Sequence, residues 1–293
     1  MEQINIQWYP GHMTRARRKM EESLKLVDAV CEIVDARIPL SSRNPEIDSI
    51  VGNKPRMMIL NRIDQADPET TKQWVRYFRE QGMVVLEADS KSGKGVREFP
   101  NAVRTLMKDK LAEFAAKGQT GRKLHIMIVG IPNVGKSTFI NKIAGRKAAE
   151  ASDRPGVTRQ NQWVKLDSFL DLLDTPGILW PKFDSQLVGE NLACTGAVKD
   201  DILDYVALAA NLMVRLREKY PERLTERYKF VPDPEASGYA LLEAGAKKRG
   251  FLISGGEYDL ERMAAVLLDE FRGGKLGRIS LEKPGETEPS PLG

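Results

Sequence analysis

The sequence predicts an α/β domain built on a mainly parallel sheet, followed by a small all-helical domain. Apolar segments typical of buried strands alternate with helix-like segments through residues 1–180, and this alternation favours a parallel sheet with helices on both faces. Polar motifs directly follow several strand-like segments, where ligands of such sheets bind. Beyond residue 185 the apolar residues instead keep the 3.6-residue period of helices.

Local signals place the elements of the first domain. Strand-like segments share apolar and β-branched residues, and they cover residues 29–36, 55–64, 83–90 and 124–130, with two more within 161–177. Helices are expected over residues 68–81, 96–117 and 136–144, with Asp67 as the first N-cap and with Gly82 and Gly145 closing the first and third. Each helix therefore connects two strands, as a parallel sheet requires.

The domain limits follow from the change of pattern. The first domain is expected to span residues 1–180, including an N-terminal arm over residues 1–20, and the helical domain residues 185–282. Two helices are expected in the latter: residues 202–220, capped by Asp200 or Asp201, and residues 258–271, ended by Gly273 and Gly274. Residues 283–293, rich in Pro and Glu, are expected to form a flexible tail.

Composition restricts the class of protein. The 293 residues are 41% hydrophobic and 29% charged, which excludes a wholly disordered chain. No apolar run approaches the roughly 18 residues that span a bilayer, and the N-terminus lacks the apolar core of a signal peptide. Two cysteines and two histidines exclude a disulfide framework and a histidine-rich metal site. We therefore expect a soluble, reduced, intracellular protein without a membrane partner.

The net charge of +4 is distributed unevenly. Basic residues gather at positions 15–19, at positions 247–249, and in the glycine-rich segment 271–278 with Lys275 and Arg278. For each cluster alone, a solvated helix face or helix end is the simpler interpretation. Three clusters in one chain favour a partner with a phosphate backbone.

Residues 130–137 carry the strongest chemical signal. Their sequence, Gly-Ile-Pro-Asn-Val-Gly-Lys-Ser, matches the phosphate-loop pattern, although an ordinary glycine turn is the alternative. Backbone N–H groups between a strand and a helix can surround phosphate oxygens. Lys136 is expected to act catalytically at the β- and γ-phosphates, and Ser137 to bind Mg²⁺. The expected nucleotide-binding residues are Asn133, Val134, Gly135, Lys136, Ser137 and Thr138.

Two later motifs suit a phosphate and magnesium site. Asp174–Gly177 ends the last strand-like segment. Asp174 is expected to hold Mg²⁺ through water, and the backbone N–H of Gly177 to sense the γ-phosphate. In the preceding loop, Thr158 is expected to bring its hydroxyl to Mg²⁺. Either motif alone is more often a plain turn or loop, so the position of both after the phosphate loop favours the functional interpretation.

Residues 61–64, Asn-Arg-Ile-Asp, resemble the guanine-specificity motif Asn-Lys-x-Asp of GTPases. The carboxylate of Asp64 can accept hydrogen bonds from guanine N1 and N2, a pair that adenine does not offer. Asn61 is expected to tie this loop to the phosphate loop. Arg62 replaces the usual lysine, and its stem can cover the base beside Ile63.

A second base-reading loop is expected at residues 89–91. Asp89-Ser90-Lys91 loosely matches Ser-Ala-Lys, the motif whose backbone N–H reads guanine O6. Only Lys91 agrees in residue type. Asp89 and Ser90 are therefore included among the expected nucleotide-binding residues.

The order of these motifs is unusual. Ras-like GTPases have the phosphate loop first, whereas here Asp64 precedes Gly130, which is a circularly permuted order. With the segments WYPGHM (8–13), DARIP (35–39), GIPNVGKS and FRGGKLGRI, the chain closely resembles the ribosome biogenesis GTPase A (RbgA/YlqF) family over essentially its whole length. The resemblance implies a cytoplasmic GTPase that acts late in large ribosomal subunit assembly. It also implies stimulation by the ribosomal particle and a helical domain that contacts ribosomal RNA.

Two further roles follow from resemblances. Ile178 stands where Ras-like enzymes place a glutamine that orients water, and the family resemblance points to His12 for this catalytic task. The alternative is that His12 anchors the arm or touches RNA. Asn133 resembles the phosphate-loop asparagine of potassium-activated GTPases, so it is expected to help hold K⁺, although asparagine is also common in turns.

Two other functions stay open from the sequence. The chain could be a nucleotide-gated RNA-binding factor in which turnover only resets the switch. It could also be a GTPase for maturation of tRNA or of the small subunit. We expect a monomer that hydrolyses GTP to GDP with Mg²⁺, and whose partners are the large-subunit precursor and ribosomal RNA.

Overall fold

The structure is a computed structural model that describes residues 13–119, 121–145, 162–166, 168–177, 179, 183, 185–198 and 204–286. The described residues form two compact units. The first comprises the residues before 183 together with residues 282–286, and the second comprises residues within Phe183–Leu281. The chain therefore leaves the first unit for the second and then returns to it.

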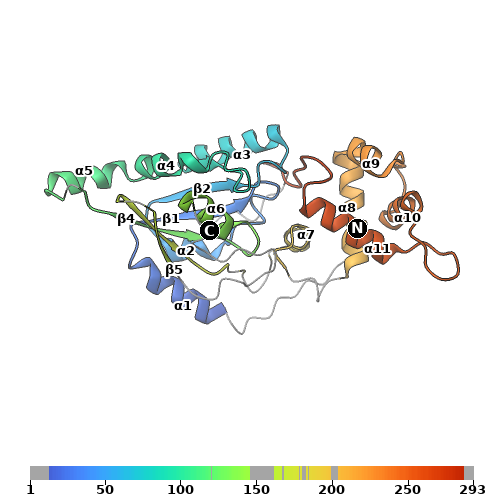
Figure 1. The fold of residues 1–293 in the computed structure, drawn as a ribbon, viewed down its shortest axis with the longest axis horizontal. Helices are drawn as coiled ribbons and strands as arrows, with labels where there is room; N and C mark the ends of the chain where they lie inside the picture. Colours follow the sequence, from blue (N-terminus) through green and yellow to red (C-terminus); the bar gives the residue numbers. More distant parts are fainter. Residues whose placement is uncertain are drawn as a thin grey trace. The chain divides into compact units, whose positions relative to one another are not determined.

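A six-stranded sheet forms the centre of the first unit, in the order β3-β2-β1-β4-β6-β5 (Figure 1). Its strands are β1 Ala29–Asp35, β2 Arg56–Asn61, β3 Val84–Glu87, β4 Leu124–Val129, β5 Gln162–Lys165 and β6 Leu170–Asp174. Neighbouring strands are parallel except for β5 with β6. Every residue of β1 is buried, as expected of a strand covered on both faces. The predicted mainly parallel α/β fold is confirmed.

Helices lie on both sides of this sheet (Figure 1). They are α1 Met13–Leu24, α2 Glu46–Val51, α3 Pro68–Glu80, α4 Phe99–Leu106, α5 Lys108–Ala116 and α6 Lys136–Ala144. The predicted cap of α3 is confirmed, because the Asp67 carboxylate accepts a hydrogen bond from the Thr70 backbone N–H at 2.8 Å. Gly82 follows this helix with φ 78°, a conformation that favours glycine.

The prediction of a single helix over residues 96–117 is wrong. The segment is a short 3₁₀ turn, Val96–Glu98, followed by α4 and α5. Met107 interrupts the helix with φ −97° and ψ 10°, and its side chain is buried. Helix α4 buries Phe99 and Val103, whereas α5 buries no residue. The core therefore holds α4 and Met107 but not the segment beyond them.

The parallel strands bring their carboxyl ends to one edge of the sheet. Asp35, which ends β1, is the register partner of Asn61, which ends β2. On the neighbouring strands, Ile128 of β4 is the partner of Asp174, the last residue of β6. The phosphate loop, the guanine-specificity loop and the acidic residue after β6 therefore begin at the same edge, as ligand binding in such sheets requires.

The second unit is helical. Its helices are α7 Gln186–Cys194, α8 Tyr205–Lys219, α9 Pro221–Tyr228, α10 Gly238–Arg249 and α11 Leu260–Arg272. The cap expected at Asp200 or Asp201 is corrected to Asp204, which accepts a hydrogen bond from the Ala207 backbone N–H at 3.0 Å. Residues 199–203 lie outside the described residues. The end of α11 at Gly273 is confirmed.

Glu270 joins three helices of this unit. Its carboxylate, on α11, accepts hydrogen bonds from the Tyr228 hydroxyl at 2.8 Å and from the guanidinium groups of Arg227 and Arg249. Burial raises the pKa of Glu270, but these hydrogen bonds and charges outweigh it, so the pKa lies below its usual value. Arg249, one of the basic cluster at 247–249, therefore has a structural partner.

Glu282 secures the chain where it returns to the first unit. Its buried carboxylate accepts hydrogen bonds from the backbone N–H groups of Leu40 at 2.8 Å and Ser41 at 3.0 Å. Its backbone carbonyl accepts one from the indole of Trp74 at 3.2 Å. The loop that follows β1 is thus fixed by a residue far away in sequence.

Candidate functional site

The phosphate loop connects β4 to α6, and its glycines are required by close contacts. A Cβ at Gly130 would lie 2.5 Å from the carbonyl oxygen of Ile33. Gly135 has φ 93°, and a Cβ there would collide with the side-chain amide of Asn61. Only glycine therefore lets this loop pack against both β1 and the guanine-specificity loop. The described helix α6 begins at Lys136, so its N-terminus adjoins the loop, as the motif predicts.

Lys136 and Asp174 are the buried charges of the site. The Lys136 ammonium donates to the carbonyl oxygens of Gly130 at 3.3 Å and Ile131 at 3.4 Å. Burial lowers the pKa of Lys136 to about 8, against the opposing charge of Asp174. Burial raises the pKa of Asp174 to about 6, against the opposing charge of Lys136. Groups shifted in this way are characteristic of functional sites.

The residues present fit a bound Mg²⁺. Both carboxylate oxygens of Asp174 are buried, and neither makes a hydrogen bond of normal geometry to a described residue. A carboxylate in this state is suited to a cation or to the water that a cation holds. Ser137 lies in the first turn of α6, while Thr158 falls outside the described residues. The described part of the chain contains no group of three or more His, Cys, Asp or Glu side chains that could hold a metal ion.

Replacing Asp174 with asparagine is expected to stabilise the protein at pH 8 without Mg²⁺ or nucleotide. Because burial raises the pKa from 3.8 to about 6, the ionised carboxylate costs up to about 3 kcal/mol of folding free energy. The ionised carboxylate destabilises the fold fully above about pH 6 and not at all below pH 3.8. The stability gained by Asp174→Asn should therefore shrink as the pH is lowered from about 6 to 3.8. Urea unfolding at both ends of this range measures it. Asp171→Asn, on the same strand but paired with Lys123, is the control that gains nothing at pH 8.

The segment after β6 lies against the phosphate loop. A Cβ at Gly177 would be 2.7 Å from the backbone nitrogen of Pro132 and 3.0 Å from the carbonyl carbon of Ile131. Upstream, the hydroxyl of Thr175 donates to the carbonyl oxygen of Ile128 at 2.8 Å. The backbone of Gly177 is therefore held beside the loop that is expected to carry the phosphates.

Asn61 joins the guanine-specificity loop to two other loops. Its side-chain amide donates to the carbonyl oxygen of Val134 at 2.7 Å. Its side-chain oxygen accepts from the Ser90 hydroxyl at 2.7 Å and from the Ser90 backbone N–H at 3.2 Å. The structure thus brings together three segments that the sequence predicted from their motifs alone.

Arg62 makes a second connection to the phosphate loop. It has φ 62°, and its guanidinium donates to the carbonyl oxygen of Asn133, itself at φ 61°, at 2.8 Å. Asparagine tolerates a left-handed backbone, but the same conformation is costly for Arg62, and such strain concentrates at functional sites. The guanidinium of Arg62 is therefore anchored to the phosphate loop. The sequence predicted only that the aliphatic part of this side chain covers the base.

The loop at residues 89–94 uses its backbone N–H groups internally. The Ser90 N–H is bonded to Asn61, and those of Lys91 and Ser92 are bonded to the Asp89 carboxylate at 2.9 and 3.1 Å. Burial raises the pKa of Asp89, but these hydrogen bonds lower it below its usual value. Reading of guanine O6 by this loop stays a prediction, and it requires one N–H group to exchange its partner for the base.

Asp64 and Ile63 complete the guanine-specificity loop. Ile63 is buried, while Asp64 is exposed. Although Asp64 is exposed as a residue, partial desolvation of its carboxylate, followed by the charge of Asp89, raises its pKa, and the charges of Arg62 and Arg37 oppose this. Thr138 is exposed on α6. His12 and Ile178 lie outside the described residues, so the catalytic assignment of His12 stays a prediction.

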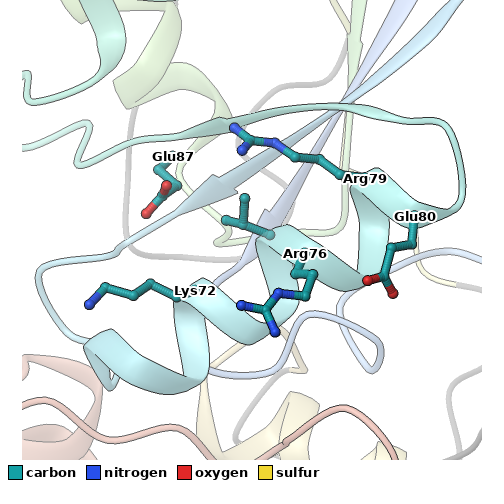
Figure 2. Close-up of a pocket in the computed structure, with 6 residues that line it drawn as sticks. Lys72, Arg76, Arg79, Glu80 and Glu87 are labelled. Atoms are coloured by element: carbon teal, nitrogen blue, oxygen red, sulfur yellow. The ribbon is translucent and has the colours of Figure 1, made fainter.

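A surface groove elsewhere in this unit does not share these features. It lies along α3 and is lined by Lys72, Val75, Arg76, Arg79, Glu80 and Glu87 (Figure 2). Three basic and two acidic side chains line it, and none of them belongs to the nucleotide motifs. None of the described helices is long and apolar enough to cross a membrane.

Comparison with known proteins identifies the family of the chain. A family model described as 50S ribosome-binding GTPase matches residues 125–228, beginning at the strand before the phosphate loop. The match leaves out the guanine-specificity loop, which here precedes that strand. The crystal structure of GNP-bound YlqF from Thermotoga maritima is 30% identical, with a TM-score of 0.63, and the match covers 93% of this chain and 100% of that one.

Curated relatives match along the whole chain. Ribosome biogenesis GTPase A of Bacillus cereus is 50% identical over 96% of this chain and 95% of its own length. The protein of that name from Thermotoga maritima is 32% identical over 97% of each. At this identity and coverage, the chain belongs to the ribosome biogenesis GTPase A family.

Proposed function

We propose that this chain hydrolyses GTP to promote late assembly of the large ribosomal subunit, as a cytoplasmic monomer that binds the subunit precursor and its ribosomal RNA. The observation that supports a guanine-nucleotide site most strongly is the pair of bonds from Asn61 and Arg62 to the phosphate-loop carbonyls. They join, in space, motifs that occur in reversed order in the sequence. Membership of a family named for ribosome biogenesis supports the ribosomal partner.

The chain's own residues supply binding and orientation for this reaction. Backbone N–H groups of the loop before α6 surround the phosphates, and Lys136 exchanges its bonds to Gly130 and Ile131 for phosphate oxygens. Ser137, and Asp174 through water, would hold Mg²⁺, and the bound ion would supply positive charge for phosphoryl transfer. Gly177, packed on the phosphate loop, is placed to report the γ-phosphate to the segment after β6.

Water positioning and potassium activation belong to the same proposal. Ile178 cannot orient water, and the resemblance to the family assigns this role to His12. The side-chain carbonyl of Asn133 helps to hold K⁺, and the left-handed backbone at this residue suits asparagine well. Faster turnover in KCl than in NaCl at equal ionic strength is the expected sign of the ion.

The helical unit carries the RNA contacts of this proposal. Within segment 271–278, the Arg272 guanidinium donates to the carbonyl oxygens of Ala193 at 2.8 Å and Cys194 at 3.2 Å, so this arginine holds the end of α7. Lys275 and Arg278 are exposed. Exposed cations in a glycine-rich loop are suited to a phosphate backbone.

Replacing both Lys275 and Arg278 with alanine is expected to weaken binding to large-subunit particles and to flatten its salt dependence. A plot of log affinity against log salt has a negative slope, and each lost phosphate contact makes this slope shallower by roughly 0.7–0.9. Sedimentation with particles over a range of KCl concentrations measures the slope, and GDP affinity should stay at the parent value. Lys108→Ala with Lys117→Ala, exposed lysines of the first unit, is the charge-matched control. Equal slopes for all three proteins would place the RNA surface elsewhere.

Crosslinking to RNA tests the choice of partner. With a non-hydrolysable GTP analogue, crosslinks are expected in large-subunit RNA. Crosslinks confined to tRNA or to small-subunit RNA would replace this proposal with the alternative maturation roles.

A further inference from the structure

A buried ion pair beside the nucleotide loops has no role in the mechanism above. Asp35 ends β1 and is 2% exposed, and Arg37 follows it with 0% exposed. The Asp35 carboxylate accepts from the Arg37 guanidinium at 2.9 Å and 2.7 Å through its two oxygens, and from the Arg37 backbone N–H at 3.0 Å. The carboxylate is therefore held in one orientation by a two-pronged charged contact.

Stability alone gives little reason for such a pair. Removing two charges from water costs about as much as their attraction returns, and apolar residues of similar volume often stabilise a core equally well. Burial raises the pKa of Asp35, but the charge and hydrogen bonds of Arg37 outweigh it, so the pKa is lowered and the carboxylate is ionised at neutral pH. A fixed negative charge is thus maintained at the end of β1.

That charge faces the guanine-specificity loop. The second oxygen of Asp35, Oδ2, lies 3.8 Å from the guanidinium Nε of Arg62, which in turn donates through Nη2 to the carbonyl oxygen of Asn133. The guanidinium of Arg62 therefore makes an ion-pair contact toward β1, longer than a hydrogen bond, and a hydrogen bond toward the phosphate loop. Its backbone is left-handed, so its contacts must offset a local strain.

We propose that Asp35 and Arg37 are positioning residues that aim Arg62 at the phosphate loop and thereby hold the guanine-specificity loop in its binding geometry. The inference rests on the proposed function, because it takes residues 61–64 as the base site. Arg37 fixes Asp35, Asp35 fixes Arg62, and Arg62 joins the two nucleotide loops. Asp64, two residues beyond Arg62, then meets the base without further rearrangement.

The Arg37→Lys variant tests this chain of contacts. Lysine keeps the charge but cannot grip both oxygens of Asp35. We expect GDP affinity, measured with a fluorescent guanine nucleotide, to fall about tenfold, the scale of one lost charged hydrogen bond. Turnover at saturating GTP should stay within about twofold of the parent, because the phosphate loop keeps its own residues.

Arg43→Lys is the matched control. Arg43 belongs to the same loop after β1, is also buried, and pairs with Glu32 at 3.4 Å and Asp48 at 2.9 Å. Neither partner belongs to the nucleotide loops. A loss of stability comparable to that of Arg37→Lys is expected, with GDP affinity unchanged. Equal nucleotide affinities in the two variants would make the Asp35–Arg37 pair purely structural and overturn the proposal.

Arg62→Met keeps the test decisive if Arg37→Lys does not fold. Arg62 is partly exposed, and its replacement alone should weaken GDP binding about tenfold. Where both variants fold, the double variant should bind no more weakly than Arg62→Met, because the two residues act in series. Full GDP affinity in Arg62→Met, or additive losses in the double variant, overturns the proposal. Unchanged guanine affinity in Asp64→Asn would instead show that the base site itself is misplaced.

Discussion

Replacing Asp64 with asparagine is expected to convert the protein from GTP binding to xanthosine triphosphate binding. In the proposed base site the Asp64 carboxylate would accept hydrogen bonds from guanine N1 and N2, whereas the side-chain amide of asparagine would offer a donor that suits the carbonyl at position 2 of xanthine. A site built to bond a base rejects a mismatched base by about 10⁴-fold or more, so a loss of at least about 10²-fold in GTP affinity is a modest expectation. Competition titrations with both nucleotides measure the change.

Acid titration gives this prediction a second readout. Partial desolvation and the charge of Asp89 raise the pKa of Asp64. As the pH is lowered, Asp64 should therefore become protonated at a higher pH than an ordinary aspartate, and the GTP affinity of the parent should fall there. The asparagine variant should lack this part of the pH dependence. Glu69→Gln, at an exposed acid of α3, is the control that leaves base preference unchanged. Parent-like GTP affinity in Asp64→Asn would remove this residue from the site.

His12→Ala is expected to lower particle-stimulated GTP turnover by about 10²–10⁴-fold, the usual contribution of a general base. The effect would be smaller if the imidazole only orients water. GTP and GDP affinities should stay near the parent values, because the proposed nucleotide contacts come from other residues, in the base and phosphate loops. The GTP form should also stay on the large subunit, since release awaits hydrolysis.

His125 offers a matched control for this variant. It is the only other histidine of the chain, and its ring lies on β4 against Trp163, 5.1 Å between ring centroids. His125→Ala should leave stimulated turnover unchanged. Full turnover in His12→Ala would contradict the catalytic role, and loss of particle binding before loss of turnover would identify the N-terminal arm as an RNA contact.

Local pattern was sufficient to predict the strands, the phosphate loop and the caps of well-patterned helices. The parallel strands follow apolar runs, whereas the edge strand β5 has only Val164 buried. Helix α6 spans Lys136–Ala144 as expected, because strand, glycine and helix signals agree there. The break at Met107 was not predicted, since its cause is burial against the core and not a change in residue type. Helix α7 buries Glu190 and Asn191, which conceals its apolar period.

The parts of the site that the sequence did not predict are contacts between distant segments. The segment DARIP was recognised as a motif, but its sequence does not reveal that Asp35 faces Arg62, because that contact depends on the pairing of β1 with β2. Glu282 and Leu40 are likewise far apart in sequence and joined only by the fold. An acidic residue at the end of a strand next to the base-binding strand is the signal that could have indicated Asp35.

The most direct test of the central claim is GTP turnover by the unmodified chain, in potassium buffer, with purified large or small ribosomal subunits. A GTPase that acts in large-subunit assembly should be slow alone, strongly stimulated by large subunits and unaffected by small ones. Equal stimulation by both subunits, or by small subunits alone, would contradict the account.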